Sequence, residues 1–494
     1  MKSKTGLVFL YYFAFASFLF GIKLWLIGKF GNETPLWDQW DAEAAGLYKP
    51  FVDGTLRFAD LLTPHNEHHI LTTSLLALLE LIVNGIWNPL LQMVVNAALH
   101  ITVMVLLVAL ITRAIGRNYL AALLAFSAFL FGLPFGWDNA LSGFQSQFYF
   151  VLLFSIISLW LTTTHGSFSL WWNFGLFSSV LAFFSLASGI FCIGATALLG
   201  FIFYIFKLRK TNQQLAAIIL LVGLFIAGVA LTPVIAEHQS LKAGSVPQFF
   251  QTLFKILCWP SHSTFLGILH NAPELVFCTL MFWQRPAVNN PKWFLISLII
   301  WTFGVASSIA YGRGSNPFVS RYIDLYAISI LINFSCLLSI FEDFNKKWKL
   351  WSFLGLFIWI VSVVVCLQVY NANYSQKELR FYSDPRTDQE INTKNYVATG
   401  NINNLKNKTF LHIPYPTGGA EHLASILDMP EVRSILPANI APPNRPVKEG
   451  RFDKSVNFLI ANYYVFIGLG LLSAVICGLL GFFTAAKKSE KIPA

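Results

Sequence analysis

Long apolar runs separated by short polar segments fill most of the chain. Each run lacks the two-residue alternation of a half-buried strand, and most approach the 20 or so apolar residues that a helix needs to cross a bilayer. The first run extends from Gly6 to about Gly21. The others cover residues 89–112, 119–135, 147–164, 168–187, 189–206, 214–233, 261–284, 292–310, 322–341, 350–370 and 457–484. The pattern therefore predicts about twelve transmembrane helices.

Composition supports this prediction. Of the 494 residues, 55% are hydrophobic and 12% are charged, about half the charge of a typical soluble protein, and the mean hydropathy is +0.60. A transmembrane barrel is excluded because its strands are shorter and alternate. We therefore predict an all-α polytopic membrane protein.

The net charge of +10 does not call for a nucleic acid partner. Basic residues favour the cytoplasmic side of membrane proteins. With the N-terminus inside, the short outer loops are poor in Lys and Arg, and the loops on the inner side hold Arg113, Arg117, Lys207, Arg209, Lys210, Arg285, Lys292, Lys346, Lys347, Lys349, Lys487, Lys488 and Lys491. This topology requires that residues 70–84, a 15-residue segment containing Glu80, lie along the outer surface instead of crossing. Both termini are then cytoplasmic.

Three outer segments are long enough to contribute to a site. The first outer loop covers residues 29–88, and a second, 234–260, contains a predicted surface helix at Val246–Cys258. The third is a polar insert at 371–456. The chain thus divides into a transmembrane module at 1–370, the outer insert at 371–456, and a last helix with a cytoplasmic tail at 457–494.

The insert has mixed local signals. Thr409–Ile413 resembles a strand, Pro416–Gly419 resembles a turn, and the residues from Ala420 to about Leu436 resemble a helix. We expect a small α/β subdomain that is too short to fold independently.

Two acidic and histidine-rich motifs occupy the first outer loop. In WDQWDAE (Trp37–Glu43), Asp38 is placed to cap the following helix. Alternatively, Asp38 or Asp41 is a general base whose pKa is raised by the desolvating tryptophans.

The second motif is PHNEHHI (Pro64–Ile70). Its His65, Glu67 and His68 suit substrate orientation, proton transfer or a divalent metal. Three adjacent candidates are a weak metal signal, so no metal is predicted.

A second candidate region is GWDNALSGFQSQF (Gly136–Phe148), at an outer turn. Asp138, Asn139, Gln145 and Gln147 could pair with sugar hydroxyls while aromatic rings cover the C–H faces. The alternative is that Trp137, Phe144, Phe148 and Tyr149 anchor the turn at the membrane interface. The sequence leaves both interpretations open.

The third region is YGRGSNPFVSRYIDLY (Tyr311–Tyr326). Arg313 and Arg321 stand outside against the basic-inside trend, and arginine can hold a phosphate through two parallel hydrogen bonds. We predict a phosphate-binding segment that includes Tyr322. A structural ion pair between Arg321 and Asp324 is the alternative.

No G-x-x-x-x-G-K-[ST] loop, nucleophile elbow or H-E-x-x-H motif occurs, which argues against ATP hydrolysis, α/β-hydrolase chemistry and a zinc protease of that type.

Taken in order, the motifs resemble those of the GT-C superfamily of membrane glycosyltransferases. They correspond to a W-D-x-W-like start (Trp37–Asp41), an H-N-E-H-R/H motif (His65–His69), a W-x-N…G-F-Q-x-Q-F motif (Trp137–Phe148) and a G-R…S-R-Y motif (Gly312–Tyr322) of a bacterial subgroup. The resemblance covers roughly residues 1–370 and, more loosely, the outer insert near the C-terminus. His69 departs from it, since many members have Arg there.

The resemblance implies an inverting enzyme of the bacterial inner membrane, with surface helices in the first outer loop. It would transfer sugar from a polyprenyl-phosphate donor to a glycan, lipid or protein acceptor, without a nucleic acid partner or an obligatory metal. Asp38 or Asp41 would be the base, and Arg321 with Arg313 would neutralise the phosphate. Sugar-binding residues would be His65, Glu67, His68, Asn139, Gln145 and Gln147. The alternative function is a polyprenyl-linked lipid or polysaccharide transporter or flippase, which should carry its polar residues at mid-membrane.

Overall fold

A computed structural model describes residues 2–343, 349–444 and 448–489. Within these ranges the regular structure is helical and contains no strand, so the all-α prediction is confirmed. Lys346, Lys347 and Lys491, which support the predicted topology, lie outside the described residues.

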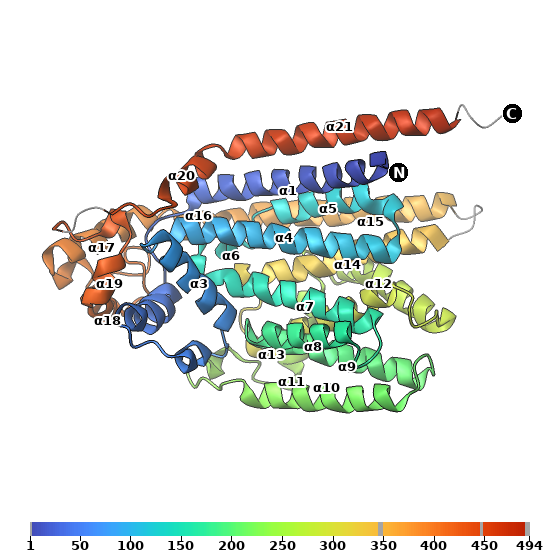
Figure 1. Cartoon of the computed structure of the whole chain (residues 1–494), viewed down its shortest axis with the longest axis horizontal. Coiled ribbons are helices and arrows are strands. Elements are labelled where there is room, and N and C mark those ends of the chain that lie inside the picture. Colours follow the sequence, from blue (N-terminus) through green and yellow to red (C-terminus); the bar gives the residue numbers. More distant parts are fainter. Residues whose placement is uncertain (1, 344–348, 445–447, 490–494) are drawn as a thin grey trace.

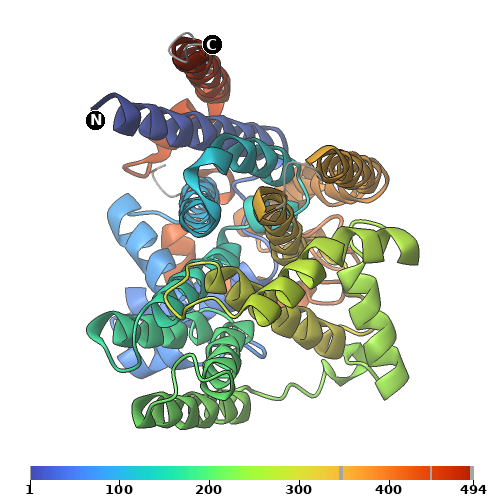
Figure 2. The ribbon, with the colours of Figure 1, turned by 90° about the vertical axis from the view of Figure 1, so that its right-hand side faces the viewer.

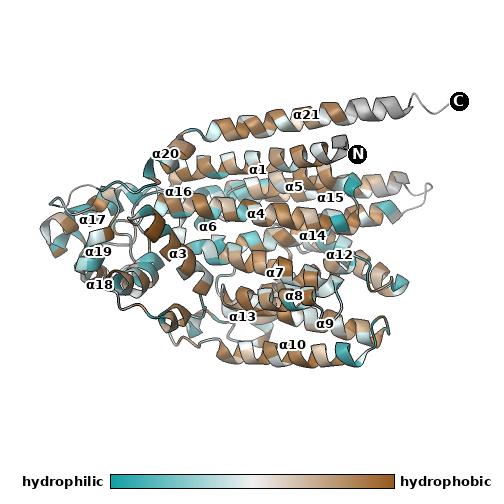
Figure 3. Ribbon diagram, viewed as in Figure 1, coloured by the Kyte–Doolittle hydropathy of each residue, from teal (hydrophilic) through white to brown (hydrophobic). Residues whose placement is uncertain are grey.

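Among the residues that the structure describes, ten helices of the bundle are long and apolar enough to cross a membrane. They run side by side, with both termini at one end (Figure 1) and mostly hydrophobic residues along their length (Figure 3). They are α1 (Lys2–Phe30), α4 (Pro89–Ile115), α7 (Ser146–Thr164), α9 (Ile190–Ile205), α10 (Asn212–Leu231), α12 (Thr264–Gln284), α13 (Trp293–Gly312), α14 (Ser320–Asp343), α15 (Lys349–Tyr370) and α21 (Tyr463–Ser489). Their number and composition define a multi-pass membrane protein.

The predicted count of twelve is not confirmed, because two of the predicted apolar runs form shorter helices. α5 (Leu120–Gly132) has 13 residues and α8 (Leu170–Phe183) has 14. At 1.5 Å per residue each is about 20 Å long, less than the apolar thickness of a bilayer of about 30 Å. Pro134 lies two residues beyond the end of α5, and Gly189 packs against the backbone of Ala182 near the end of α8. These local breaks shorten helices that hydropathy alone had extended.

α1 and α21 pack closely at one edge of the bundle (Figure 2). A Cβ atom on Gly21 would lie 2.7 Å from the backbone nitrogen of Ile467, and one on Gly470 would lie 2.6 Å from that of Phe18. Glycine therefore permits this close approach, as at many membrane helix interfaces.

The end of the bundle opposite the termini, here called the site end, carries the first loop and the insert (Figure 1). The loop forms η1 (Gln39–Tyr48), α2 (Lys49–Val52), η2 (Phe58–Leu62) and α3 (Leu71–Asn84); the insert forms α16 (Gln376–Ser383), α17 (Arg386–Thr399), α18 (Ala420–Leu427) and α19 (Pro430–Ile435), before α20 (Asp453–Ala461). As expected, α3 is too short to cross. Trp40, Tyr48 and Trp87 of the loop region share one buried core with Leu423 and Ile440 of the insert. Loop and insert therefore stabilise each other.

The predicted α/β character of the insert is wrong. Thr409–Ile413 forms turns, in which the backbone N–H groups of His412 and Ile413 both donate to the Thr409 carbonyl. With no neighbouring strand, this short apolar stretch has no ladder to join. The predicted surface helix in the second outer segment forms as α11 (Val246–Leu257).

Candidate active site

Asp38 lies at the start of the π-helical η1, but its carboxylate does not cap that helix. The expected capping role is therefore wrong, and the side chain, 37% exposed, points its Oδ1 to within 3.7 Å of His65 Nε2. The preceding residue, Trp37, has a φ of 49°, which is strained for an aromatic residue. Its N–H donates to the Pro414 carbonyl of the insert, so contact with the insert helps to fix the strained segment next to Asp38.

The expected rise in the Asp38 pKa is also wrong. Burial raises the pKa of this carboxyl, but His65, Arg321 and His68 together lower it further, so that the net pKa lies below its ordinary value. Asp38 is therefore ionised at neutral pH and can accept a proton.

The histidine motif forms a tight turn that brings its two ends together. His65 and His68 exchange backbone hydrogen bonds of 2.9 and 3.1 Å across Asn66, which has a φ of 52°. Burial, together with Arg313, lowers the pKa of the His68 imidazole to about 4 although Glu67 opposes this shift. His68 is therefore neutral near pH 7.

Asp41 faces the insert. Its two carboxylate oxygens accept hydrogen bonds of 2.7 Å, one from the Tyr415 hydroxyl and one from His422 Nε2. It does not line the cavity described below. Of the two predicted base candidates, only Asp38 has a carboxylate at the cavity.

A buried polar cluster holds the Asp38 segment in place. Gln39 accepts a hydrogen bond from the Leu36 backbone N–H and donates to both Glu43 and Gln92, each at 2.9 Å. Gln92 of α4 also donates to Glu43 at 3.0 Å. A Cβ atom on Gly143 would lie 2.3 Å from Gln92 Oε1. Gln92 therefore contacts both the segment that carries Asp38, through Gln39, and the turn at Gly143.

Glu43 makes stability depend on pH. Burial raises its pKa to about 7 against the hydrogen bonds from Gln39 and Gln92. Because the folded state then holds the proton more tightly than the unfolded chain, stability should fall as pH rises from about 4.5 towards 8, by on the order of 3 kcal/mol. We expect the melting temperature of the wild type to decrease between pH 5 and 8, and that of Glu43→Gln to decrease less. Glu80, also with a pKa raised by burial, will leave a residual slope. Equal slopes would contradict this account.

The aromatic residues of the Gly136–Phe148 region and the adjoining Tyr149 are buried, which overturns the interfacial-anchoring interpretation. Trp137, Phe144, Phe148 and Tyr149 are all 5% exposed or less. Asp138 lies on the short α6 (Trp137–Leu141), where burial raises its pKa although Arg321 opposes the shift.

The amides of this motif divide between cavity and core. Gln145 lines the cavity and accepts a hydrogen bond of 3.2 Å from the buried Gln147. Asn139 donates to the Arg321 carbonyl and to Asp324, each at 3.0 Å, and is fully buried. Gln145 is thus the amide placed to meet a substrate.

Arg313 and Arg321, from the Tyr311–Tyr326 region, each lie close to a carboxylate, but the partner of Arg321 is not the expected Asp324. Arg321 Nε lies 3.8 Å from Asp138 Oδ2, whereas Asp324 pairs with Asn139, so the expected Arg321–Asp324 ion pair is wrong. Arg313 Nη1 lies 3.4 Å from Glu67.

Glu67 is fixed as an anion. It accepts a hydrogen bond of 2.6 Å from His238. Burial opposes its ionisation, but Arg313 and His238 outweigh this effect and lower its pKa to about 2. Arg313 therefore carries a permanent counter-ion.

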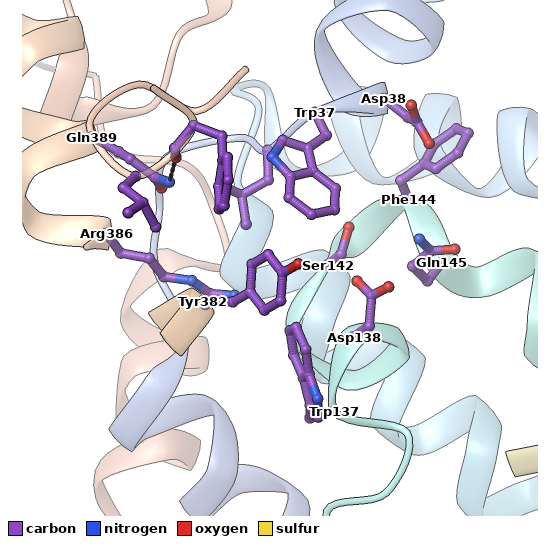
Figure 4. A pocket seen from close by; sticks show the side chains of 13 residues that line it. Trp37, Asp38, Trp137, Asp138, Ser142, Phe144, Gln145, Tyr382, Arg386 and Gln389 are labelled. Carbon is purple, nitrogen blue, oxygen red and sulfur yellow. Dashed lines mark hydrogen bonds between the residues drawn. The ribbon is translucent and has the colours of Figure 1, made fainter. Parts of the chain in front are cut away.

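A first cavity, here called the aromatic cavity, lies between the bundle and the insert (Figure 4). It has a volume of about 550 Å³, including space open to solvent, and is lined by Leu36, Trp37, Asp38, Trp137, Asp138, Ser142, Phe144, Gln145, Tyr382, Arg386, Gln389, Phe410 and Leu411. The insert supplies five of these side chains, from Tyr382 onward. Sequence reasoning missed Tyr382, Arg386 and Phe410; an aromatic pair at 381–382 in an otherwise polar helix was the available signal.

A second cavity, here called the bundle cavity, has a volume of about 1220 Å³. Glu67, His68, Arg313, Tyr322 and Lys242 make part of its lining polar, and the remainder is largely apolar. Through Phe191 it adjoins a further apolar hollow between α9, α10 and α13 of about 1150 Å³. Because Tyr322 lines the bundle cavity while Arg321 approaches Asp138, the start of α14 lies between the two cavities.

No cluster of three or more His, Cys, Asp or Glu side chains able to hold a metal occurs in the described ranges. The weak metal signal of the histidine motif is therefore not reinforced by the fold.

No protein-family model and no curated protein matches the chain. It is similar to solved structures of the oligosaccharyltransferase of Archaeoglobus fulgidus. One is AglB in complex with an inhibitory peptide and a dolichol-phosphate (TM-score 0.49, 10% identity), and another is the apo form (TM-score 0.41, 9% identity). Each comparison covers 92% of this chain and 63% of the other, so the chain spans less than two thirds of the archaeal protein. Both neighbours are membrane glycosyltransferases of the GT-C superfamily.

Proposed function

We propose that this protein is an inverting glycosyltransferase that moves a sugar from a polyprenyl-phosphate-linked donor to an acceptor. The observation that carries the proposal is the pair of cavities on either side of the start of α14, one largely apolar and one aromatic and polar. Arg321, beside Asp138, would stand where a lipid-linked phosphate from one side meets an acceptor from the other.

The bundle cavity suits the donor. Arg313 and Lys242 offer positive charge to a phosphate, and side chains of α9, α10 and α13 offer an apolar path to a prenyl chain. Lys242 Nζ lies 5.8 Å from the Tyr311 ring centroid. His68, neutral near pH 7, can hydrogen-bond to the sugar without adding charge.

The chemistry is a single displacement. Asp38 accepts the proton of an acceptor hydroxyl, whose oxygen attacks the anomeric carbon from the face opposite the phosphate. The bond between that carbon and the phosphate oxygen breaks, and the electron pair leaves with the lipid phosphate. Arg321 stabilises the charge that develops there.

The site end would face the exterior of the inner membrane, with both termini cytoplasmic. Support for this orientation comes from the short connections between helices at the end of the termini, which carry Arg113, Arg117, Lys207, Arg209 and Lys210. Glu67, His65 and Arg321 occupy the opposite end.

The donor assignment is tested by mass spectrometry of lipids that co-purify after gentle extraction. We expect a polyprenyl phosphate with the wild type and about tenfold less with Arg313→Gln, since a charge-assisted hydrogen bond is lost. Arg57→Gln is the matched control, because Arg57 is exposed at the same end and pairs with Asp60. Absence of the lipid from the wild type, or equal amounts in all three proteins, would contradict the proposal.

A further inference from the structure

The walls of the aromatic cavity are formed by rings from three separate segments. Tyr382 of the insert stacks on Trp137 of α6, with ring centroids 5.4 Å apart, and meets Trp37 of the first loop edge-on at 5.8 Å. Phe410 of the insert lies 5.7 Å from Tyr382. Tyr382 is thus the ring that joins the other three, and the cavity exists only because the insert covers the loop.

Polar groups with unused hydrogen-bonding capacity stand between these rings. In Figure 4, the side chains of Asp38, Asp138, Ser142 and Gln145 make no hydrogen bonds with one another. Among the described residues, the one close charged partner of the Asp138 carboxylate is Arg321 Nε, at 3.8 Å. Gln145 uses its oxygen to accept from Gln147, which leaves its Nε2 free to donate. The cavity therefore offers two carboxylates, a hydroxyl and an amide donor within an aromatic enclosure.

We infer that the aromatic cavity binds the acceptor and that the acceptor is a carbohydrate, held by ring faces against its C–H surfaces and by these polar groups at its hydroxyls. The inference rests on the proposed function and narrows it to glycan acceptors. Carbohydrates combine apolar C–H faces with many hydroxyls, and the lining matches both.

A peptide acceptor fits the cavity less well. One common mode of peptide binding, pairing with the edge of a sheet, is not open here because the described part of the chain contains no strand. A lipid tail fits less well too, because six of the thirteen lining residues are polar or charged. The combination of aromatic rings and directional hydrogen-bonding groups instead suits the ring of a sugar.

The test measures sugar binding to the full-length protein in nanodiscs by saturation-transfer NMR. The probes are methyl glycosides of neutral hexoses and N-acetylhexosamines, with a set of short neutral peptides for comparison. We expect at least one glycoside to bind and the peptides not to bind. Tyr382→Ala should weaken glycoside binding about tenfold, the scale of one lost aromatic contact, whereas Tyr382→Phe should retain it within about threefold. Phe58→Ala, at an exposed aromatic residue of the site end that does not line the cavity, should leave it unchanged.

Phe410→Ala gives a second readout if Tyr382→Ala does not fold, because Phe410 lies in a partly exposed turn; it should weaken binding in the same direction. Peptide binding without glycoside binding would overturn the inference, and so would glycoside binding that neither alanine variant reduces. The two proposals can fail independently. If the protein binds glycosides but carries no polyprenyl phosphate, the proposed function is contradicted and this inference stands.

Discussion

Asp38→Asn is expected to lower the rate of sugar transfer by about 10²–10⁴-fold while leaving the donor lipid bound, because a proton acceptor is lost without a change in shape. Its carboxylate lines the aromatic cavity and is ionised by its surroundings, with His65 Nε2 at 3.7 Å. The measurement is transfer of radiolabelled hexose from a polyprenyl-phosphate hexose to the best-binding glycoside, with lipid retention measured in parallel.

Asp41→Asn is the matched control, since it is the same substitution three residues further along the chain. Asp41 is hydrogen-bonded to Tyr415 and His422 of the insert. Its substitution should therefore lower the melting temperature and leave turnover at saturating acceptor largely unchanged. If Asp41→Asn abolished turnover and Asp38→Asn did not, Asp38 would not be the base.

Arg321→Gln is expected to lower turnover by about 10²–10³-fold, the scale of removing one group that stabilises developing charge in a transition state. The guanidinium Nε lies 3.8 Å from Asp138, which lines the aromatic cavity, and the next residue, Tyr322, lines the bundle cavity. Removal of this cation should slow departure of the lipid phosphate and leave glycoside binding largely intact. Single-turnover transfer with pre-bound donor separates the two effects.

Part of that loss could arise because Asp138 is left as an uncompensated buried charge. Arg321→Gln combined with Asp138→Asn removes both members of the pair and distinguishes the two causes. If Arg321 acts on the phosphate, the double variant stays as slow as Arg321→Gln. Recovery of turnover in the double variant would show that Arg321 serves only to neutralise Asp138.

Hydropathy was enough to locate the helices of the bundle, since burial in lipid imposes a simple requirement on composition. It overestimated the lengths of α5 and α8, because helix ends depend on local breaks such as Pro134. A hydropathy average over many residues obscures such breaks. The predicted strand at Thr409–Ile413 failed for a related reason. A strand needs a partner, and a single segment cannot show whether one exists.

The motifs indicated which types of residue form the candidate site, but the interaction partner of each side chain depended on the fold. Nothing local to Trp37–Asp41 reveals that His65 and Arg321 lower the pKa of Asp38, because these groups come from distant parts of the chain. Similarly, the partner of Arg321 proved to be Asp138 on α6 and not the nearby Asp324. The aromatic pair at 381–382 was the one local signal for Tyr382, but its contact with Trp37 of the first loop, like that of Phe410 with Tyr382, depends on the fold.

The core that joins Trp40, Tyr48 and Trp87 to Leu423 and Ile440 has a consequence for biogenesis. The ribosome must make more than 300 residues after Trp87 before Leu423 and Ile440 exist, so these large aromatic rings emerge long before their partners. Until then, the apolar surface of the nascent first loop lacks the insert residues that cover it, so we expect a chaperone to bind it. Proteins truncated before the insert should accordingly be degraded instead of accumulating as partly active fragments.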